Sequence, residues 1–144
     1  MNNQWDSFFE EKMIKIFTNK KTILDIGGGL RTSVSKGNRL DKKSVWLEEY
    51  IKKVDYKVLD KVPDYHPDIV GDVQNLNLPD SSIDAIICIA VLEHVEEPGK
   101  AVQEIYRVLK PGGYCFIYLP FLYYYHPLQG YYKDFYRFTS DGLK

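Results

Sequence analysis

The sequence predicts one α/β domain over residues 1–144, with a doubly wound, mostly parallel sheet of about five strands. Three observations predict this fold class. Short apolar runs alternate with segments that have helical periodicity, as in βαβ units. The run at 83–90 is apolar almost throughout, which is typical of a central strand covered on both faces. Three of the other runs end at glycine or aspartate, as expected where strands meet the loops of a binding edge.

The elements follow from hydrophobic spacing and from turn signals. The predicted strands cover residues 22–26, 56–59, 69–70, 83–90 and 114–119. The predicted helices cover the first twenty residues, the segment from 44 to 54, and a segment from about Pro98 to the Lys-Pro-Gly-Gly turn at 110–113. Residues 30–43 are polar and without a clear period, so they are predicted to form a loop.

Charge and hydropathy exclude several classes of protein. The net charge is −1, which argues against a nucleic-acid binder that works through a strongly basic face. The longest purely apolar run, 85–92, is far shorter than the ~20 residues that span a bilayer. The N-terminal segment is acidic and lacks the pattern of a signal peptide. We therefore expect a cytoplasmic protein without membrane or nucleic-acid partners, and the absence of metal-ligand spacing predicts no metal.

The residues that end the predicted strands are the first candidates for a binding site, because ligands of open parallel sheets bind beyond the carboxyl ends of the strands. Glycines at 27–29 would let the backbone approach a ligand closely. Asp60 and Asp72 end the next two strands, and a carboxylate accepts hydrogen bonds from both hydroxyls of a ribose. Any one of these features alone fits a tight turn or a helix cap equally well.

The combination of motifs is more specific. Ile-Leu-Asp-Ile-Gly-Gly-Gly at 23–29, Gly-Asp-Val at 71–73, Leu-Glu-His-Val at 92–95 and Arg-Val-Leu-Lys-Pro-Gly-Gly at 107–113 resemble the class I S-adenosylmethionine-dependent methyltransferases. Within this family the sequence looks like the small-molecule type, and the resemblance runs from about residue 22 to 143. It implies a Rossmann-like fold, S-adenosyl-L-methionine as cofactor, and methyl transfer to a small-molecule acceptor. Arg31, where the family has a small residue, and the long loop at 30–43 depart from the family pattern.

The resemblance also implies roles for individual residues. The glycine turn would line the methionine part of the cofactor, and Asp25 would accept from its ammonium group. Asp60 would hold the ribose hydroxyls, and Asp72 would accept from the adenine amino group. The implied cofactor-binding residues are Asp25, Gly27, Gly28, Gly29, Asp60, Asp72, Val73 and Ala90.

The acceptor side is predicted to involve the aromatic-rich segment at 121–138, which follows the fifth strand. The candidate catalytic residues are His94, His126 and Asp134, each a possible acceptor of the proton from an attacking hydroxyl. Aromatic faces can stack on a sugar ring while these polar groups form hydrogen bonds with its hydroxyls. A similar His-Pro, Asp, aromatic, Arg, Phe, Thr pattern also occurs in relatives associated with sugar and glycan biosynthesis. The alternatives are that His94 steadies a turn, that Asp134 forms an i,i+3 ion pair with Arg137, and that most of the tyrosines cover the sheet edge.

A helix start signal at 139–141 comes just before the chain stops, which predicts a C-terminally short version of the family's domain. The fifth strand would then be an exposed edge. We expect the aromatic-rich segment at 121–138, the aromatic tail, to cover this edge, or two chains to pair through it as a homodimer. A catalytically inactive remnant, binding cofactor or serving a structural role, is the alternative function. A nicotinamide-dependent dehydrogenase is disfavoured because Thr32 stands where its third glycine belongs.

Overall fold

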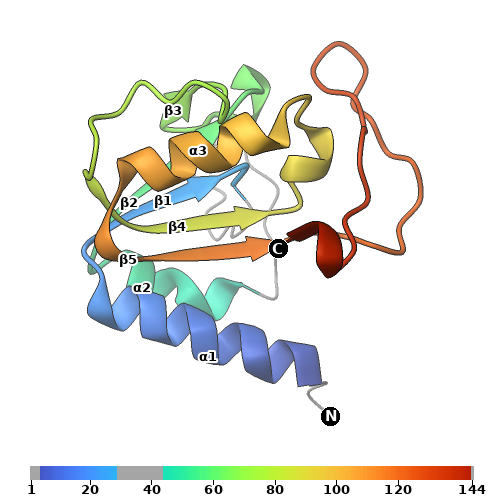
Figure 1. Cartoon of the computed structure of the whole chain (residues 1–144). Helices are drawn as coiled ribbons and strands as arrows, with labels where there is room; N and C mark the ends of the chain where they lie inside the picture. The colour runs from blue at the N-terminus through green and yellow to red at the C-terminus, as the bar shows by residue number, and fades with distance from the viewer. Residues whose placement is uncertain (1–3, 29–43, 144) are drawn as a thin grey trace.

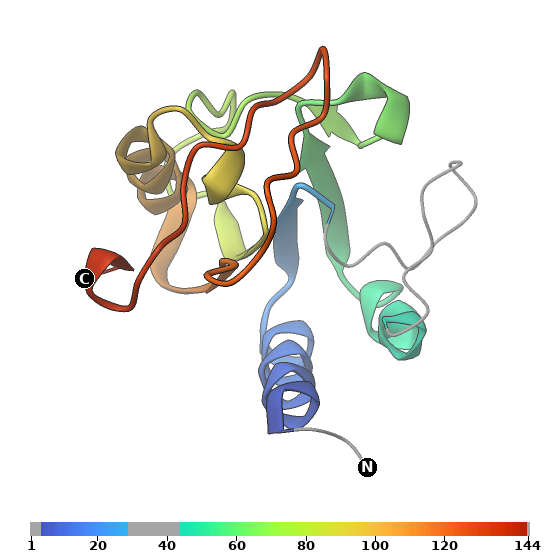
Figure 2. The ribbon, with the colours of Figure 1, turned by 90° about the vertical axis from the view of Figure 1, so that its right-hand side faces the viewer.

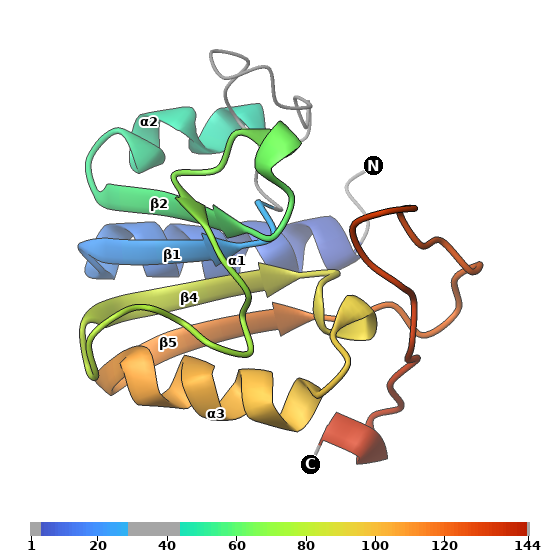
Figure 3. The same ribbon diagram turned by 90° about the horizontal axis from the view of Figure 1, so that it is seen from above.

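A computed structural model describes residues 4–28 and 44–143, and it confirms the predicted fold class. The described strands form one parallel sheet in the order β3-β2-β1-β4-β5, which Figure 3 shows from above. The strands are β1 (Thr22–Ile26), β2 (Asp55–Asp60), β3 (Ile69–Val70), β4 (Ile83–Ile89) and β5 (Leu109–Tyr118). The helices are α1 (Gln4–Asn19), α2 (Glu48–Ile51) and α3 (Pro98–Val108). Gly29, Arg31, Thr32 and the predicted loop at 30–43 lie outside the described residues.

Helices cover both faces of the sheet, because alternate residues of the central strands are apolar on both sides (Figure 1). Leu24 and Ile26 of β1 pack with α3 in one core cluster. Ile23 of β1 packs with Ile87 of β4 and with α1 in the other. In the part of the chain that the structure describes, no helix has the length and hydropathy needed to cross a membrane.

The segment from 44 to 54, predicted as one helix, forms a shorter helical unit. A 3₁₀ turn at Val45–Leu47 leads into α2, which ends at Ile51. Leu47 is fully buried against the α1 side of the sheet, so the apolar spacing identified the packing contact correctly but overestimated the length of the helix.

The Lys-Pro-Gly-Gly turn ends α3 as predicted, but it also belongs to β5. The strand begins at Leu109, which pairs with Ile83, and the register then shifts so that Ala85 pairs with Tyr114. Gly112 has φ +74°, and a Cβ at Gly113 would lie 2.7 Å from Leu109 Cγ. The two glycines therefore allow a bulge in the strand that a pattern of apolar residues does not reveal.

The aromatic tail crosses the carboxyl ends of the strands, and the expectation that it covers the β5 edge is wrong. In Figure 2 it passes in front of the sheet and over toward β2. Tyr131 Oη donates to Asp64, in the turn after β2, and the Phe135 N–H donates to the Glu93 carbonyl at 2.8 Å. Tyr123, Tyr124 and Tyr125 are more than half exposed, so these three tyrosines are not buried against the sheet.

A network centred on Arg107 ties α3 to the segment between β3 and β4. Arg107 donates to both carboxylate oxygens of Glu104 at 2.8 Å and to the carbonyls of Leu76 and Leu78. Glu104 accepts the Leu76 N–H at 2.8 Å. The Arg107 hydrogen bonds, partly opposed by desolvation, lower the pKa of Glu104 from 4.5 to about 2.

This pKa predicts an acid-sensitive stability. A carboxyl with a depressed pKa in the folded state contributes stability above its unfolded pKa and loses it as pH falls through its folded value. We expect the free energy of unfolding of the wild type to decline as pH falls from 4.5 to about 2 because Glu104 is protonated. Glu104→Gln should lack this part of the decline. Urea titrations of both proteins across that range measure it. Parallel pH profiles for the two proteins would contradict the assignment.

Candidate functional site

A cavity of about 640 Å³ lies at the carboxyl edge of the sheet, over the ends of β1, β2, β3 and β4. Five of the predicted cofactor-binding residues line it: Gly27, Asp60, Asp72, Val73 and Ala90. Residues 127–133 and Phe135 of the tail form another wall, with Tyr131 and Tyr132 among the lining residues. The strand ends and the tail therefore enclose one cleft, as the order of the strands predicts.

Two residues that line the cavity, at the ends of β1 and β4, have left-handed backbone conformations. Gly27 has φ +83°, and its N–H donates to the Leu59 carbonyl at 2.7 Å. A Cβ at Gly27 would lie 2.4 Å from Val91 Cγ2, a distance that real Cβ atoms do not reach. Ala90, directly after β4, also has a positive φ of 54°. Glycine at 27 is thus required by the left-handed backbone and by the close approach of the Val91 side chain.

Asp60 and Asp72 present carboxylates at the ends of β2 and β3. Asp60 Oδ1 accepts the Val62 N–H at 2.9 Å. Asp72 Oδ1 accepts the Gln74 N–H at 2.9 Å, and its Oδ2 accepts from Lys61 Nζ at 3.1 Å. Burial acts to raise the pKa of Asp72, but the Gln74 and Lys61 contacts outweigh it, so the pKa is lowered. Asp72 is therefore an ionised hydrogen-bond acceptor at neutral pH.

Asp25 and Gly28 lie outside the cavity lining. Asp25 is fully buried beneath the turn and accepts from Tyr56 Oη at 2.5 Å. Burial and the neighbouring Asp25 charge raise the pKa of Tyr56, which keeps its hydroxyl a donor. Gly28 is buried, with φ +61°. Contact of Asp25 with the cofactor's ammonium group remains a prediction, and Gly29 lies outside the described residues.

Of the three predicted catalytic residues, His94 lines the cavity. It belongs to the 3₁₀ turn Leu92–His94 after β4, and its ring lies 4.4 Å from that of Tyr132. Its Nδ1 lies 2.8 Å from the Lys133 carbonyl oxygen, to which the Nδ1–H donates a hydrogen bond. Burial, partly offset by this carbonyl, lowers the pKa of His94, so the ring is neutral at pH 7 with its lone pair on Nε2.

His126 and Asp134 lie outside the cavity lining, and the ring centroids of His126 and His94 are 4.7 Å apart. The Asp134 carboxylate is 1 % exposed and accepts two hydrogen bonds from Arg137, at 2.6 and 2.8 Å. It also accepts the His126 N–H at 2.9 Å. The Arg137 contact holds the pKa of Asp134 well below its usual range. The i,i+3 ion pair, one of the two alternatives for Asp134, is thus present, and it makes Asp134 a weak base.

Sequence reasoning missed two charged residues of this region. Lys61 lines the cavity and bridges to Asp72. Glu93 is fully buried beside His94, and among the described residues neither of its carboxylate oxygens has a hydrogen-bond partner. An acidic residue beside a histidine, between the apolar residues of Val-Leu-Glu-His-Val, was the available signal for Glu93.

Comparisons with known proteins agree with this architecture. A family model described as a methyltransferase domain matches residues 24–117. The ubiquinone/menaquinone biosynthesis C-methyltransferase UbiE of Chromobacterium violaceum is 34% identical over 124 residues, which cover 82% of this chain and 50% of that protein. The thiol S-methyltransferase TMT1B of Rattus norvegicus is 47% identical over 53 residues, covering 36% of this chain and 22% of that protein.

Among solved structures, a putative S-adenosyl-L-methionine-dependent methyltransferase of Methanococcus maripaludis superposes with a TM-score of 0.53 at 23% identity. The superposition covers 76% of this chain and 52% of that one, and it supports the fold. The matched segments span half or less of the two curated relatives. Since the family model matches well over half of the chain, the chain belongs to the methyltransferase-domain family.

Proposed function

We propose that the chain binds S-adenosyl-L-methionine in the cleft and transfers its methyl group to a small-molecule acceptor, with a sugar or glycan-precursor hydroxyl as the acceptor. The order of residues along the sheet edge carries the proposal. Asp72, Asp60 and Gly27 follow the neighbouring strands β3, β2 and β1. That order matches adenine, ribose and methionine in an extended cofactor.

The residues present fit this cofactor. Gly27 lines the cavity, so its backbone can approach the methionine part closely, and Asp60 can accept from ribose hydroxyls at the cavity wall. The adenine amino group would replace Lys61 or Gln74 as a donor to Asp72, since these two residues now occupy its oxygens. Bound cofactor supplies an activated methyl group, so the chain's task is to align the acceptor and exclude water.

The tail supports a ring-shaped acceptor. Tyr131, Tyr132 and Phe135 line the wall opposite the strand ends, and aromatic faces stack on the apolar faces of sugar rings. The relatives include a thiol S-methyltransferase and a C-methyltransferase of ubiquinone and menaquinone biosynthesis, so the test compares sugar, thiol and quinol acceptors.

The test is methyl transfer by the 144-residue chain to a panel of nucleotide sugars, free sugars, thiols and quinols, with products identified by mass spectrometry. We expect a methylated sugar hydroxyl. Transfer to thiols or quinols alone would refute the sugar acceptor. If the folded chain bound the cofactor without methylating any member of the panel, the inactive remnant would be favoured.

A variant of the tail wall tests the position of the acceptor. We expect Tyr132→Leu to lower kcat/KM for the sugar acceptor by roughly fivefold, equivalent to about 1 kcal/mol, because one aromatic contact is lost. Tyr125→Leu is the control, since Tyr125 is 71% exposed and lies outside the cavity lining. Equal kcat/KM values for the two variants would place the acceptor elsewhere.

A further inference from the structure

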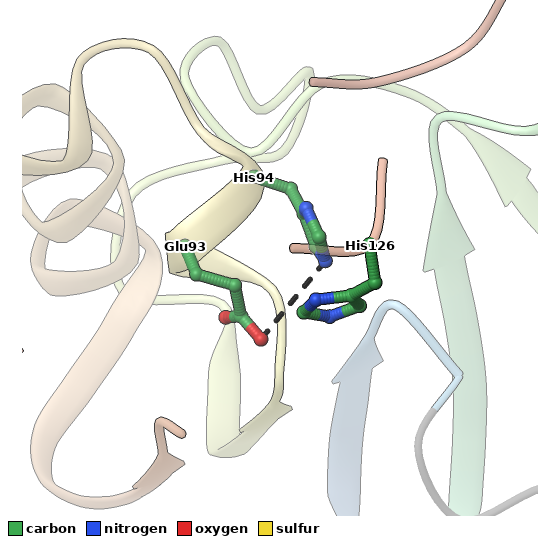
Figure 4. A group of neighbouring side chains, drawn as sticks. All are labelled: Glu93, His94 and His126. Atoms are coloured by element: carbon green, nitrogen blue, oxygen red, sulfur yellow. Dashed lines mark ion pairs between the residues drawn. The ribbon is translucent and has the colours of Figure 1, made fainter. Parts of the chain in front are cut away.

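Three potential metal ligands converge behind the acceptor side of the cleft. Glu93 and His94 come from the turn after β4, and His126 comes from the aromatic tail, as Figure 4 shows. One ligand atom from each residue lies within 4.8 Å of the other two. The sequence predicts no metal, because His126 lies far along the chain from Glu93 and His94, and only the path of the tail brings them together.

The hydrogen bonds of the two histidines orient them as metal ligands do. His94 Nδ1 is engaged by the Lys133 carbonyl at 2.8 Å, which leaves the Nε2 lone pair facing Glu93 Oε1 at 4.0 Å. His126 Nδ1 lies 2.9 Å from the Tyr124 carbonyl oxygen and 3.1 Å from Asp134 Oδ2, both acceptors. A ligating histidine typically donates its other ring N–H to a carbonyl or carboxylate in this way.

The burial of Glu93 points to a cation independently of how the two histidines are arranged. Its side chain has no exposed surface, and its two oxygens lack a hydrogen-bond partner within the described ranges 4–28 and 44–143. A buried carboxylate without a partner costs folding free energy unless it is neutralised or coordinates a cation. Arg137, the guanidinium of this region, is bound to Asp134 instead.

We propose that Glu93, His94 and His126 bind a divalent transition-metal ion of the Zn²⁺ type, and that the two histidines act as metal ligands rather than as proton acceptors. Two imidazoles and one carboxylate form a common set for catalytic zinc, which leaves a further position open. Ligand atoms about 2.0–2.2 Å from an ion lie roughly 3.3–3.5 Å apart, so binding requires the three side chains to close by about 1 Å.

A metal ion bound by these three residues could assist the proposed methyl transfer. His94 lines the cavity, so the ion would lie beside the cleft, and an acceptor hydroxyl that reached it would lose its proton more readily than a free one. This use rests on the proposed methyl transfer, whereas the binding of the ion does not. Metal binding is therefore measured without cofactor or acceptor, so that either proposal can fail alone.

The experiment is calorimetric titration of Zn²⁺ into the 144-residue chain, made without a histidine tag and stripped with EDTA. We expect one ion per chain, and binding at least about 100-fold weaker in His94→Asn, His126→Asn and Glu93→Gln. His66→Asn is a matched control, because His66 is the remaining histidine, is exposed, and has φ 49°, which asparagine tolerates. Glu97→Gln is the exposed carboxylate control.

A second measurement needs no variant and so does not depend on the variants folding. The chain has three histidines, and their imidazole nitrogens can be followed by NMR during the titration. Zn²⁺ should shift the ring signals of His94 and His126 and leave those of His66 in place. Absence of binding, shifts at His66 alone, or cluster variants that bind as tightly as the wild type would overturn the proposal.

Discussion

Gly27→Ala is expected to reduce both the stability of the chain and its affinity for S-adenosyl-L-methionine. The new Cβ would lie 2.4 Å from Val91 Cγ2, on a backbone with φ +83°. Left-handed strain and steric overlap together should lower the free energy of unfolding by about 2–4 kcal/mol. Because Gly27 lines the cavity, cofactor affinity should fall by at least about tenfold in protein that remains folded.

Two further variants separate the causes. Val91→Ala in the Gly27→Ala background removes the overlapping methyl group, so it should restore part of the lost stability but not the part due to φ. Gly99→Ala is the matched control: it lies in α3 with no atom within 4 Å of a new Cβ, and it should be neutral or stabilising. Denaturant titration and calorimetry measure the two effects. Equal changes in the free energy of unfolding for Gly27→Ala and Gly99→Ala would show that a Cβ at position 27 does not overlap with Val91.

Asp60→Ala is expected to weaken cofactor binding by about 1–3 kcal/mol, or roughly 5- to 150-fold, because it removes charge-assisted hydrogen bonds to buried hydroxyls. Asp60→Asn retains one acceptor oxygen and should lie between the wild type and the alanine variant. Asp55→Ala is the control, since Asp55 is an exposed aspartate at the opposite end of β2. Titration calorimetry measures all three. Wild-type affinity in Asp60→Ala would mean that Asp60 is not the ribose ligand.

Much of the scaffold was predictable because its determinants are local in sequence. The buried run of β4 and the glycine turn after β1 each carry a strong signal, and the parallel order places Asp60, Asp72 and Gly27 at one edge. The early start of β5 was not predictable, because it depends on a register shift permitted by two glycines.

The acceptor side was predictable only in part, because its geometry depends on long-range contacts. The bond from Tyr131 to Asp64 and the bonds from the tail to the Glu93 carbonyl determine where the tail lies. No periodicity marks such contacts, so exposed Tyr123 and cavity-lining Tyr132 look alike in sequence. The neighbourhood of Glu93 and His126 emerges only once the tail is placed.

Isothermal titration of the 144-residue chain with S-adenosyl-L-methionine and with S-adenosylhomocysteine tests the central claim most directly. The account predicts one site per chain with roughly micromolar affinity for both ligands, because they share the adenosine that Asp60 and Asp72 would hold. It also predicts that Asp60→Ala weakens both to a similar extent. A chain shown to be folded by circular dichroism that binds neither ligand would contradict the account.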